Sequence, residues 1–243
     1  MAKPVADIWY GVTAAGDGIL RLRELAVDPY LAGDMWLLRG GARDLLVDSG
    51  TGIVSPRPLV QEIAGKPVLA VALNGFYDHA GGLHNFDERA CHPLEAAAVA
   101  RPSDASSLVP AFVSDAMLSA LPWAGYATRD YRMSGAEPTC LLDDGEVIDL
   151  GGRELQVLHL PGVSAGSLAL FEPASGALFT GDTLFLDPQA RPAAARAGAV
   201  LYRESLARLR ALPFTTVYGG HYGSFDRAAA DGLIDRLLAE LSD

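Results

Sequence analysis

Two series of short apolar runs, each followed by segments with helical patterning, restrict this chain to a layered α+β fold. In the first series, Trp36 to Arg39 and Leu45 to Val47 have strand character and are joined around Gly40 and Gly41, which predicts an antiparallel hairpin. Residues 67–73 form an apolar run without alternation, which is typical of a strand covered on both faces. Such a strand needs a further layer on each side of its sheet.

Helical segments are expected to supply one of these layers. Residues 80–86 are expected to begin a helix, and a strand at 88–92 leads into a second helix at Pro93. A third helical segment is predicted from Val109 to Leu121. Three aromatic residues follow this segment: Trp123, Tyr126 and Tyr131. Their side chains either cover a pocket or pack a long connection onto the core, and the sequence leaves both roles open.

The second series predicts a run of antiparallel strands. Turn residues separate its strand-like runs, which cover residues 146–150, 153–160, 167–171 and 177–182. Helices are expected at 204–213 and after 219–226, where Ser224 is the expected N-cap. Because no linker divides the chain, we expect one domain over residues 1–243, with two sheets inside and helices outside.

The charge balance limits the expected partners. The 19 Lys and Arg residues against 30 Asp and Glu residues leave a net charge of −11, the wrong sign for neutralising phosphates or anionic lipids. We therefore expect a small-molecule substrate, with neither nucleic acid nor a membrane as partner. The chain shows no secretory or membrane-spanning apolar run, so a cytoplasmic protein is expected. Cys91 and Cys140 form no CxxC pair and are expected in the core.

Four loops carry the residues suited to chemistry, and each follows a predicted strand. They are residues 74–82, 158–167, 179–183 and 219–224. Each loop taken singly is more typical of turn chemistry, since Asp caps turns and Gly adopts positive φ without strain.

Taken in order with the Asp48-Ser49-Gly50 segment, the four loops resemble the metallo-β-lactamase superfamily over nearly the whole chain. Members of that superfamily carry an HxHxDH loop, a PGH loop, a GD loop and a final GH. Asp78 and His79 match the end of the first motif, and Asp182 and His221 match the last two. The resemblance implies a four-layered αββα sandwich that holds metal ions between its loops.

The chain departs from the family pattern at three histidine positions, which hold Asn74, Phe76 and Val163. The resemblance implies that these positions would hold one of two metal ions. Phe and Val offer no lone pair, and one amide oxygen is a weak ligand. The sequence therefore predicts that this half of the metal site is lost.

The other half of the site is intact, and the resemblance assigns it two imidazoles and two carboxylates as metal ligands: Asp78, His79, Asp182 and His221. Such a set can hold one divalent ion, with zinc favoured and iron or manganese as alternatives. The competing interpretation is a cluster that holds no metal, in which protonated histidines pair with the carboxylates.

With one metal ion, the resemblance implies a metallo-hydrolase acting on an ester, a lactone or a thioester. Asp78 or Asp182 would accept the proton of the attacking water, and Tyr222 would donate a hydrogen bond to the developing oxyanion. Substrate contacts are expected from Asn74, Phe76, Val163 and Tyr222. The alternative function is a non-catalytic binding or scaffold module with an empty site.

Overall fold

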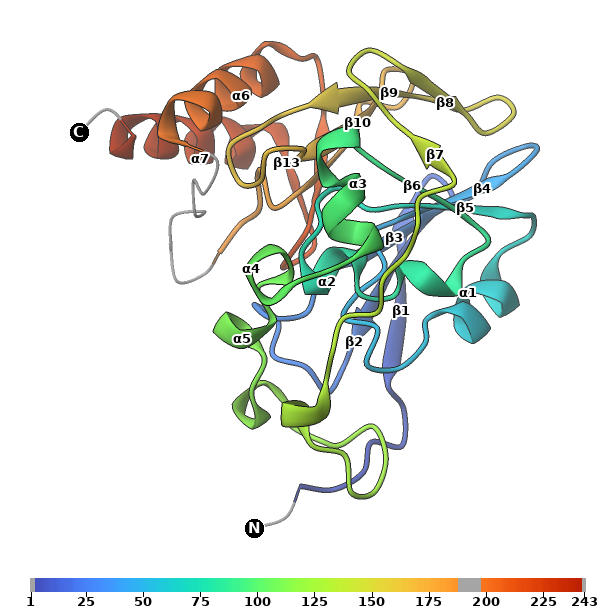
Figure 1. Cartoon of the computed structure of the whole chain (residues 1–243). Helices are drawn as coiled ribbons and strands as arrows, with labels where there is room; N and C mark the ends of the chain where they lie inside the picture. The colour runs from blue at the N-terminus through green and yellow to red at the C-terminus, as the bar shows by residue number, and fades with distance from the viewer. Residues whose placement is uncertain (1–2, 188–197, 242–243) are drawn as a thin grey trace.

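The computed structural model describes residues 3–187 and 198–241, and these form two mixed β-sheets that pack face to face (Figure 1). The first sheet has seven strands, which neighbour one another in chain order. They are β1 (Tyr10–Gly16), β2 (Ile19–Glu24), β3 (Met35–Leu38), β4 (Asp44–Val47), β5 (Val68–Val71), β6 (Glu88–Cys91) and β7 (Cys140–Leu141).

The second sheet has six strands in the order β13-β12-β11-β10-β9-β8. They are β8 (Val147–Asp149), β9 (Glu154–His159), β10 (Leu168–Glu172), β11 (Ala177–Gly181), β12 (Thr216–Gly219) and β13 (Ser224–Asp226). The antiparallel pairing predicted for β8 to β11 is confirmed, and so is the β3–β4 hairpin.

Helices cover the outer face of each sheet. The first sheet carries α1 (Arg57–Ile63), α2 (Tyr77–Ala80), α3 (Pro93–Ala100), α4 (Asp104–Ser107), α5 (Val109–Phe112) and the 3-10 turns Leu83–Asn85, Asp115–Met117 and Thr128–Asp130. The second sheet carries α6 (Ala199–Ala211) and α7 (Arg227–Glu240), which lie together at the C-terminal end of the molecule (Figure 1). The expected four-layered α+β sandwich is confirmed.

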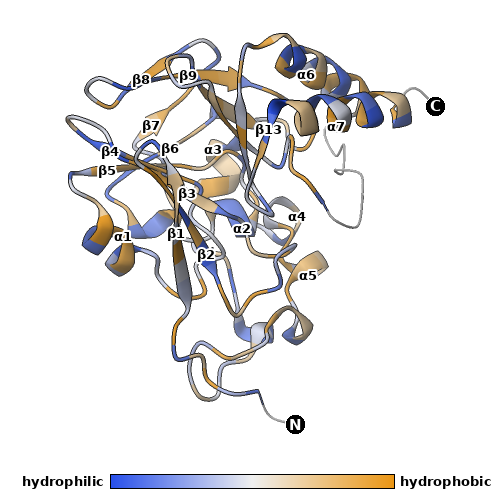
Figure 2. Ribbon diagram, turned by 180° about the vertical axis from the view of Figure 1, so that it is seen from behind, coloured by the Kyte–Doolittle hydropathy of each residue, from blue (hydrophilic) through white to orange (hydrophobic). Residues whose placement is uncertain are grey.

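Alternation along the strands divides the apolar side chains among three cores. Leu69 and Val71 of β5 face the second sheet, while Ala70 between them faces the helices on the outside. Because both faces of β5 are covered, its sequence is apolar without alternation. The outer helices α6 and α7 instead mix polar and apolar side chains, since only one face of each is buried (Figure 2).

Parallel pairing brings several strand ends to one edge of the sandwich. β4, β5 and β6 run parallel in the first sheet, and β11 and β12 run parallel in the second. A backbone hydrogen bond of 2.8 Å from the Leu168 N–H to the Leu73 carbonyl links the two sheets near this edge. The loops that follow these strands therefore meet in one place.

Two helix predictions in the first half of the chain were wrong. Residues 80–86 do not begin a helix, because Gly81 packs against the backbone of Thr51 and the His84 and Asn85 side chains bond to nearby carbonyls, which closes a 3-10 turn. The segment from Val109 to Leu121 breaks after α5, where Val113 is extended.

Two further sequence predictions need correction. Ser224 does not cap the last helix, because it lies in β13 and pairs there with Tyr218 of β12. The N-cap is Asp226, whose side chain accepts the Ala229 N–H. Cys91 is buried as expected, but Cys140 is exposed because it lies on the short edge strand β7.

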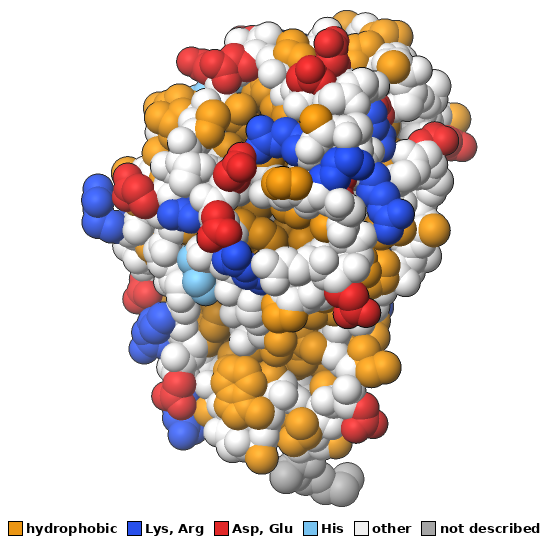
Figure 3. Space-filling model, turned by 90° about the vertical axis from the view of Figure 1, so that its right-hand side faces the viewer, with side chains coloured by type: hydrophobic (Ala, Val, Ile, Leu, Met, Phe, Trp, Pro, Cys, Tyr) orange, Lys and Arg blue, Asp and Glu red, His pale blue; other side chains and the backbone are white. Residues whose placement is uncertain are grey.

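Charges on the α1 side of the molecule are largely paired. Figure 3 shows basic and acidic side chains interspersed on this face. Arg57 pairs with Asp87 at 2.7 Å, and Arg43 pairs with Glu88 at 2.5 Å. Across the described parts of the chain, we find no helix with the length and apolar character needed to cross a bilayer.

Arg153 ties the two sheets together. Its Nη1 donates to the carbonyls of Asp17 and Arg39, at 2.9 and 3.2 Å, in the connections of the first sheet. Its Nε and Nη2 donate to both carboxylate oxygens of Glu172 in β10, at 2.7 and 2.8 Å. These hydrogen bonds from Arg153 hold the pKa of the Glu172 carboxyl below its usual range.

Glu172→Gln is expected to lower the free energy of unfolding at pH 7 by about 1.5–3 kcal/mol, the usual contribution of hydrogen bonds to a charged group. Because folding lowers the pKa of Glu172, its stabilisation is present above the unfolded-state pKa of about 4.3 and is lost as pH falls through the lower folded value. Urea denaturation should therefore show a smaller difference between wild type and variant below pH 4 than at pH 7. Asp87→Asn, in an exposed and screened ion pair, is the control and should change little at either pH. Equal differences at both pH values for Glu172→Gln would contradict this assignment.

Candidate metal centre and substrate cavity

Three strand ends bring two imidazoles and two carboxylates together. Asp78 and His79 lie on α2, the single helical turn that follows β5. Asp182 directly follows β11, and His221 follows β12. Because these strands end at the same edge of the sandwich, residues far apart in the sequence meet there.

The four side chains form a compact cluster. Asp182 Oδ1 lies 3.0 Å from His79 Nε2 and 3.1 Å from His221 Nε2. Asp78 Oδ2 lies 3.8 Å and 3.5 Å from the same two nitrogen atoms. One ligand atom from each of Asp78, His79 and His221 falls within 4.8 Å of the others. The structure thus gathers the four residues that the sequence singled out, and their role as metal ligands stays a prediction.

Asp48, which the sequence analysis did not assign to the site, orients His79. Its Oδ2 lies 2.7 Å from His79 Nδ1, and both side chains are buried. The Asp48 backbone is left-handed with φ of 59°, and its Oδ1 accepts the Leu73 N–H at 2.8 Å. A proton on Nδ1 that is donated to Asp48 leaves the Nε2 lone pair directed into the cluster. The sequence signal that could have identified Asp48 is its position directly after β4, the strand that runs parallel to β5 beside it.

Asp48→Asn is expected to weaken zinc binding by about 10–100-fold, because the amide no longer enforces the His79 tautomer and orientation. Competition against a chromogenic chelator measures this change. Asp44→Asn is the matched control: Asp44 is equally buried on β4 and accepts the Gly40 and Gly65 N–H groups, without contacting His79. Asp44→Asn should lower the free energy of unfolding and leave the affinity for zinc unchanged. An equal loss of affinity in both variants would contradict the orienting role of Asp48.

The loop that carries His221 is held on both sides by Asp34. The Asp34 N–H donates to the Gly220 carbonyl at 2.6 Å, and its carboxylate accepts the Gly223 N–H at 2.7 Å. Arg21 neutralises that carboxylate through two hydrogen bonds of 2.8 Å. A Cβ at Gly220 would lie 2.8 Å from the His79 ring, so only glycine permits this close approach.

Burial and mutual charge shift the pKa values in the cluster. Burial raises the pKa of the Asp78 carboxyl, and the neighbouring His79 only partly offsets this. Burial acts in the same direction on Asp182, but His79 and His221 hold its pKa well below the usual range. Burial alone would lower the pKa of both imidazoles, yet the adjacent carboxylates hold both above the ordinary value for histidine. The two carboxylates therefore favour a positive charge between them, which protonated imidazoles or a bound cation would supply.

The chemistry of these donors fits a divalent cation. His79 Nε2 is fully buried and finds no partner of hydrogen-bond geometry among the described residues, although Asp182 Oδ1 lies close to it. A buried nitrogen lone pair that faces another imidazole and two carboxylates is a typical ligand environment for a divalent transition metal. The two carboxylates together offset the charge of one such ion.

Asn74 engages the second carboxylate oxygen of Asp182. Its Nδ2 donates to Asp182 Oδ2 at 3.1 Å, and its Oδ1 accepts the Phe76 N–H at 2.9 Å. Reversing the amide would place its oxygen against a carboxylate, so the hydrogen bonds define its orientation. Both polar atoms of the Asn74 side chain are therefore engaged. Asn74 is not among the residues that line the neighbouring cavity, and its contact with substrate stays a prediction.

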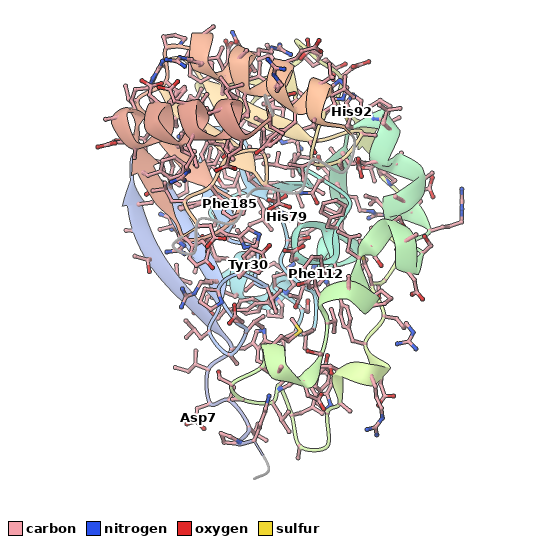
Figure 4. The ribbon with its side chains drawn as sticks, turned by 90° about the vertical axis from the view of Figure 1, so that its left-hand side faces the viewer. Asp7, Tyr30, His79, His92, Phe112 and Phe185 are labelled. Carbon is pink, nitrogen blue, oxygen red and sulfur yellow. The ribbon has the colours of Figure 1, made fainter. Side chains whose placement is uncertain are left out.

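Phe76 and Val163 line the cavity that opens beside the cluster, together with Asp78, Asp182 and His221. Its volume is about 530 Å³, counting the solvent-filled mouth. Figure 4 shows Tyr30, Phe112 and Phe185 near one another in this region, with His79 close by.

Tyr222 is not itself among the residues that line this cavity, although it neighbours two that are, Phe185 and His221. Its ring lies beside Phe185, with 6.5 Å between the ring centroids. Tyr30 lines the cavity instead and stacks on His221 at 6.1 Å. The proposed hydrogen bond from Tyr222 to a substrate oxyanion stays a prediction, and Tyr30 is a cavity residue that the sequence analysis missed.

The long segment after α3 reaches the cavity through Leu108 and Phe112. The aromatic residues singled out in the sequence lie elsewhere: Tyr131 is buried and donates its hydroxyl to the Thr51 carbonyl, while Trp123 is half exposed against Tyr126. Their positions favour packing of a long connection over coverage of the pocket.

Comparison with known proteins agrees with this arrangement. Residues 29–221 match the sequence profile of the Metallo-beta-lactamase superfamily. The acyl-coenzyme A thioesterase MBLAC2 of Homo sapiens is 34% identical over 189 residues, a match that covers 73% of this chain and 67% of the human protein. A hydroxyacylglutathione hydrolase of Rhodospirillum rubrum is 37% identical over 98 residues, or 40% of this chain and 37% of that protein.

Solved structures show the same fold. A metallo-beta-lactamase from Pontibacter korlensis superposes with a TM-score of 0.70 at 18% identity, over 96% of this chain and 99% of the other. At that level of identity the superposition concerns the arrangement of strands and helices alone.

Proposed function

Because this chain belongs to the metallo-beta-lactamase superfamily, we propose that it is a hydrolase of thioesters that works with one divalent metal ion. The observation that carries the proposal is the cluster of Asp78, His79, Asp182 and His221 at the wall of an open cavity. The human relative, which this chain matches over about two thirds of that protein's length, is an acyl-coenzyme A thioesterase and suggests the substrate class.

These four side chains would hold the ion, and zinc suits two imidazoles with two carboxylates. A divalent ion bound there polarises a carbonyl group and lowers the pKa of water. Asp48 fixes the His79 ring, and Asp34 fixes the loop of His221, so the protein positions both imidazoles before substrate binds.

The acid–base role falls to Asp78. Both oxygens of Asp182 already contact neighbouring side chains, Oδ1 the two imidazoles and Oδ2 the Asn74 amide. Asp78 lines the same cavity, and its carboxylate lies farther from the two imidazoles, at 3.8 and 3.5 Å. As water oxygen attacks the thioester carbon, Asp78 would take its proton; as the carbon–sulfur bond breaks, Asp78 would return that proton to the departing thiol.

The test is thiol release from butyryl-coenzyme A by protein reconstituted with zinc. We expect release that stops on adding a chelator and that falls at least 100-fold in Asp182→Ala, because loss of a metal ligand should exceed the roughly 10–100-fold effect of a residue that only orients one. Asp7→Ala is the control, because Asp7 is exposed and lies far from the cavity in Figure 4. Release that persists in Asp182→Ala and under chelation would contradict the proposal.

A second function is favoured by the residue types of Asn74, Phe76 and Val163, which offer no histidine ligand for a second metal ion. The protein would then be a non-catalytic binding or scaffold module. An absence of thiol release from the zinc-loaded wild-type protein, with acyl-coenzyme A and S-acylglutathione substrates alike, would favour this function.

A further inference from the structure

The cavity beside the cluster has two chemically different walls. The polar wall is made by the candidate metal ligands Asp78, Asp182 and His221. Most of the remaining lining is apolar and includes Phe76, Val163, Leu108 and Phe112. A substrate carbonyl held at the polar wall would therefore place one of its substituents against a largely apolar lining.

The apolar wall is held in place. Val163 is only 3% exposed and packs in the core under α6, and Phe76 contacts the same core. The buried Glu95 carboxylate accepts the Gly75 N–H at 3.0 Å and the Gly166 N–H at 2.8 Å. Glu95 thus joins the loop of Phe76 to the loop of Val163, so the wall cannot easily rearrange to admit a polar group.

Hydrogen-bonding groups are scarce on this side of the cavity. Among the lining residues that the structure describes, the polar side chains beyond the cluster are Tyr30 and Tyr77, and the Tyr77 hydroxyl donates to the Leu31 carbonyl at 3.1 Å. A hydroxyl group carried by the substrate and placed against Phe76 and Val163 would lose water and find no hydrogen-bonding atom on either side chain.

We propose that the half-site formed by Phe76 and Val163 binds the acyl group of the thioester and selects unsubstituted apolar acyl groups against hydroxyacyl groups. This inference rests on the proposed thioester hydrolysis. It separates the two activities named for the relatives, since one acts as an acyl-coenzyme A thioesterase and the other as a hydroxyacylglutathione hydrolase.

The kinetic test compares butyryl-coenzyme A with 3-hydroxybutyryl-coenzyme A. The two substrates share the thiol, and the added hydroxyl lies two carbons from the reacting carbonyl, where the apolar wall would meet it. We expect kcat/KM to be on the order of 100-fold higher for butyryl-coenzyme A, since an apolar pocket rejects a hydroxyl-bearing analogue by about that factor. Values within about 3-fold of each other would overturn the proposal.

A hydroxyl placed in the wall should reduce this preference. Val163→Thr keeps the side-chain shape and offers a partner, so the ratio of the two kcat/KM values should fall by about 10-fold, mainly through faster hydrolysis of the hydroxyacyl substrate. Val147→Thr is the matched control, because Val147 lies exposed on β8, and its ratio should equal that of wild type. Phe76→Tyr adds a hydroxyl to the same wall, and the ratio of its two kcat/KM values provides the test if Val163→Thr fails to fold. An unchanged ratio in the folded wall variants would overturn the assignment.

A binding measurement gives a result that does not depend on turnover. S-butyl-coenzyme A and S-(3-hydroxybutyl)-coenzyme A are thioethers that cannot be hydrolysed, and calorimetry should show tighter binding of the first by at least 10-fold. If neither thioester is hydrolysed while this binding preference holds, the proposed hydrolysis fails and the apolar half-site stands. If thioesters are hydrolysed and the thioethers bind equally, the half-site is overturned and the hydrolase stands.

Discussion

Purified protein loaded with excess zinc, iron or manganese is expected to retain at most one equivalent of metal, and His221→Ala is expected to retain none. Asp78, His79, Asp182 and His221 form one cluster, and no second group of metal-ligating side chains lies within the parts of the chain that the structure describes. Removing one imidazole leaves a single nitrogen donor beside two buried carboxylates. The resulting loss of affinity should exceed the roughly 10–100-fold effect of a residue that only orients a ligand.

Elemental analysis after gel filtration measures the equivalents, and Asp78→Ala should behave as His221→Ala does. His159→Ala is the control, because His159 stacks on His92 with 4.0 Å between ring centroids and takes no part in the cluster. Two equivalents in the wild type, or one retained in His221→Ala, would contradict the assignment of a single metal site.

The triple variant Asn74→His, Phe76→His, Val163→His is expected to bind a second equivalent of zinc. Asn74 now donates to Asp182 Oδ2, and its replacement frees that oxygen to contact a second ion. Phe76 and Val163 already line the same cavity, so imidazoles at these positions would add nitrogen donors beside the existing cluster.

The matched control replaces the same three residues with alanine, which frees the oxygen without adding donors. It should bind one equivalent, as the wild type does, and thermal unfolding shows whether either variant remains folded. A folded triple-histidine variant that binds one equivalent would show that these three positions do not form the other half of a metal site.

Much of the fold could be predicted because strand patterns are local. The apolar runs and turns placed β3, β4, β5 and the four strands from β8 to β11 correctly. The errors fell on short elements whose form depends on contacts from elsewhere. Ser224 is a strand residue because β12 lies beside it, and Leu83–Asn85 form a 3-10 turn because Gly81 packs on Thr51.

The candidate site could be predicted only in part. Asp78, His79, Asp182 and His221 stood in motifs that keep their order in the chain, and the structure brings them together. The supporting residues carry no such motif. Glu95 lies on α3 and reaches both cavity loops, and Asp34 holds the loop of His221 from a distant part of the chain.

The sequence by itself predicted the layered architecture and singled out Asp78, His79, Asp182 and His221, because both depend on residue type and order. Only the tertiary structure decided that Asn74 caps Asp182 across 108 residues, that Asp48 orients His79 across 31, and that Phe76 and Val163 share one cavity wall. Hydrogen bonds and cavity walls between such distant residues exist only after two sheets have packed with their strand ends at one edge. No local pattern in the chain encodes which side chains then face one another.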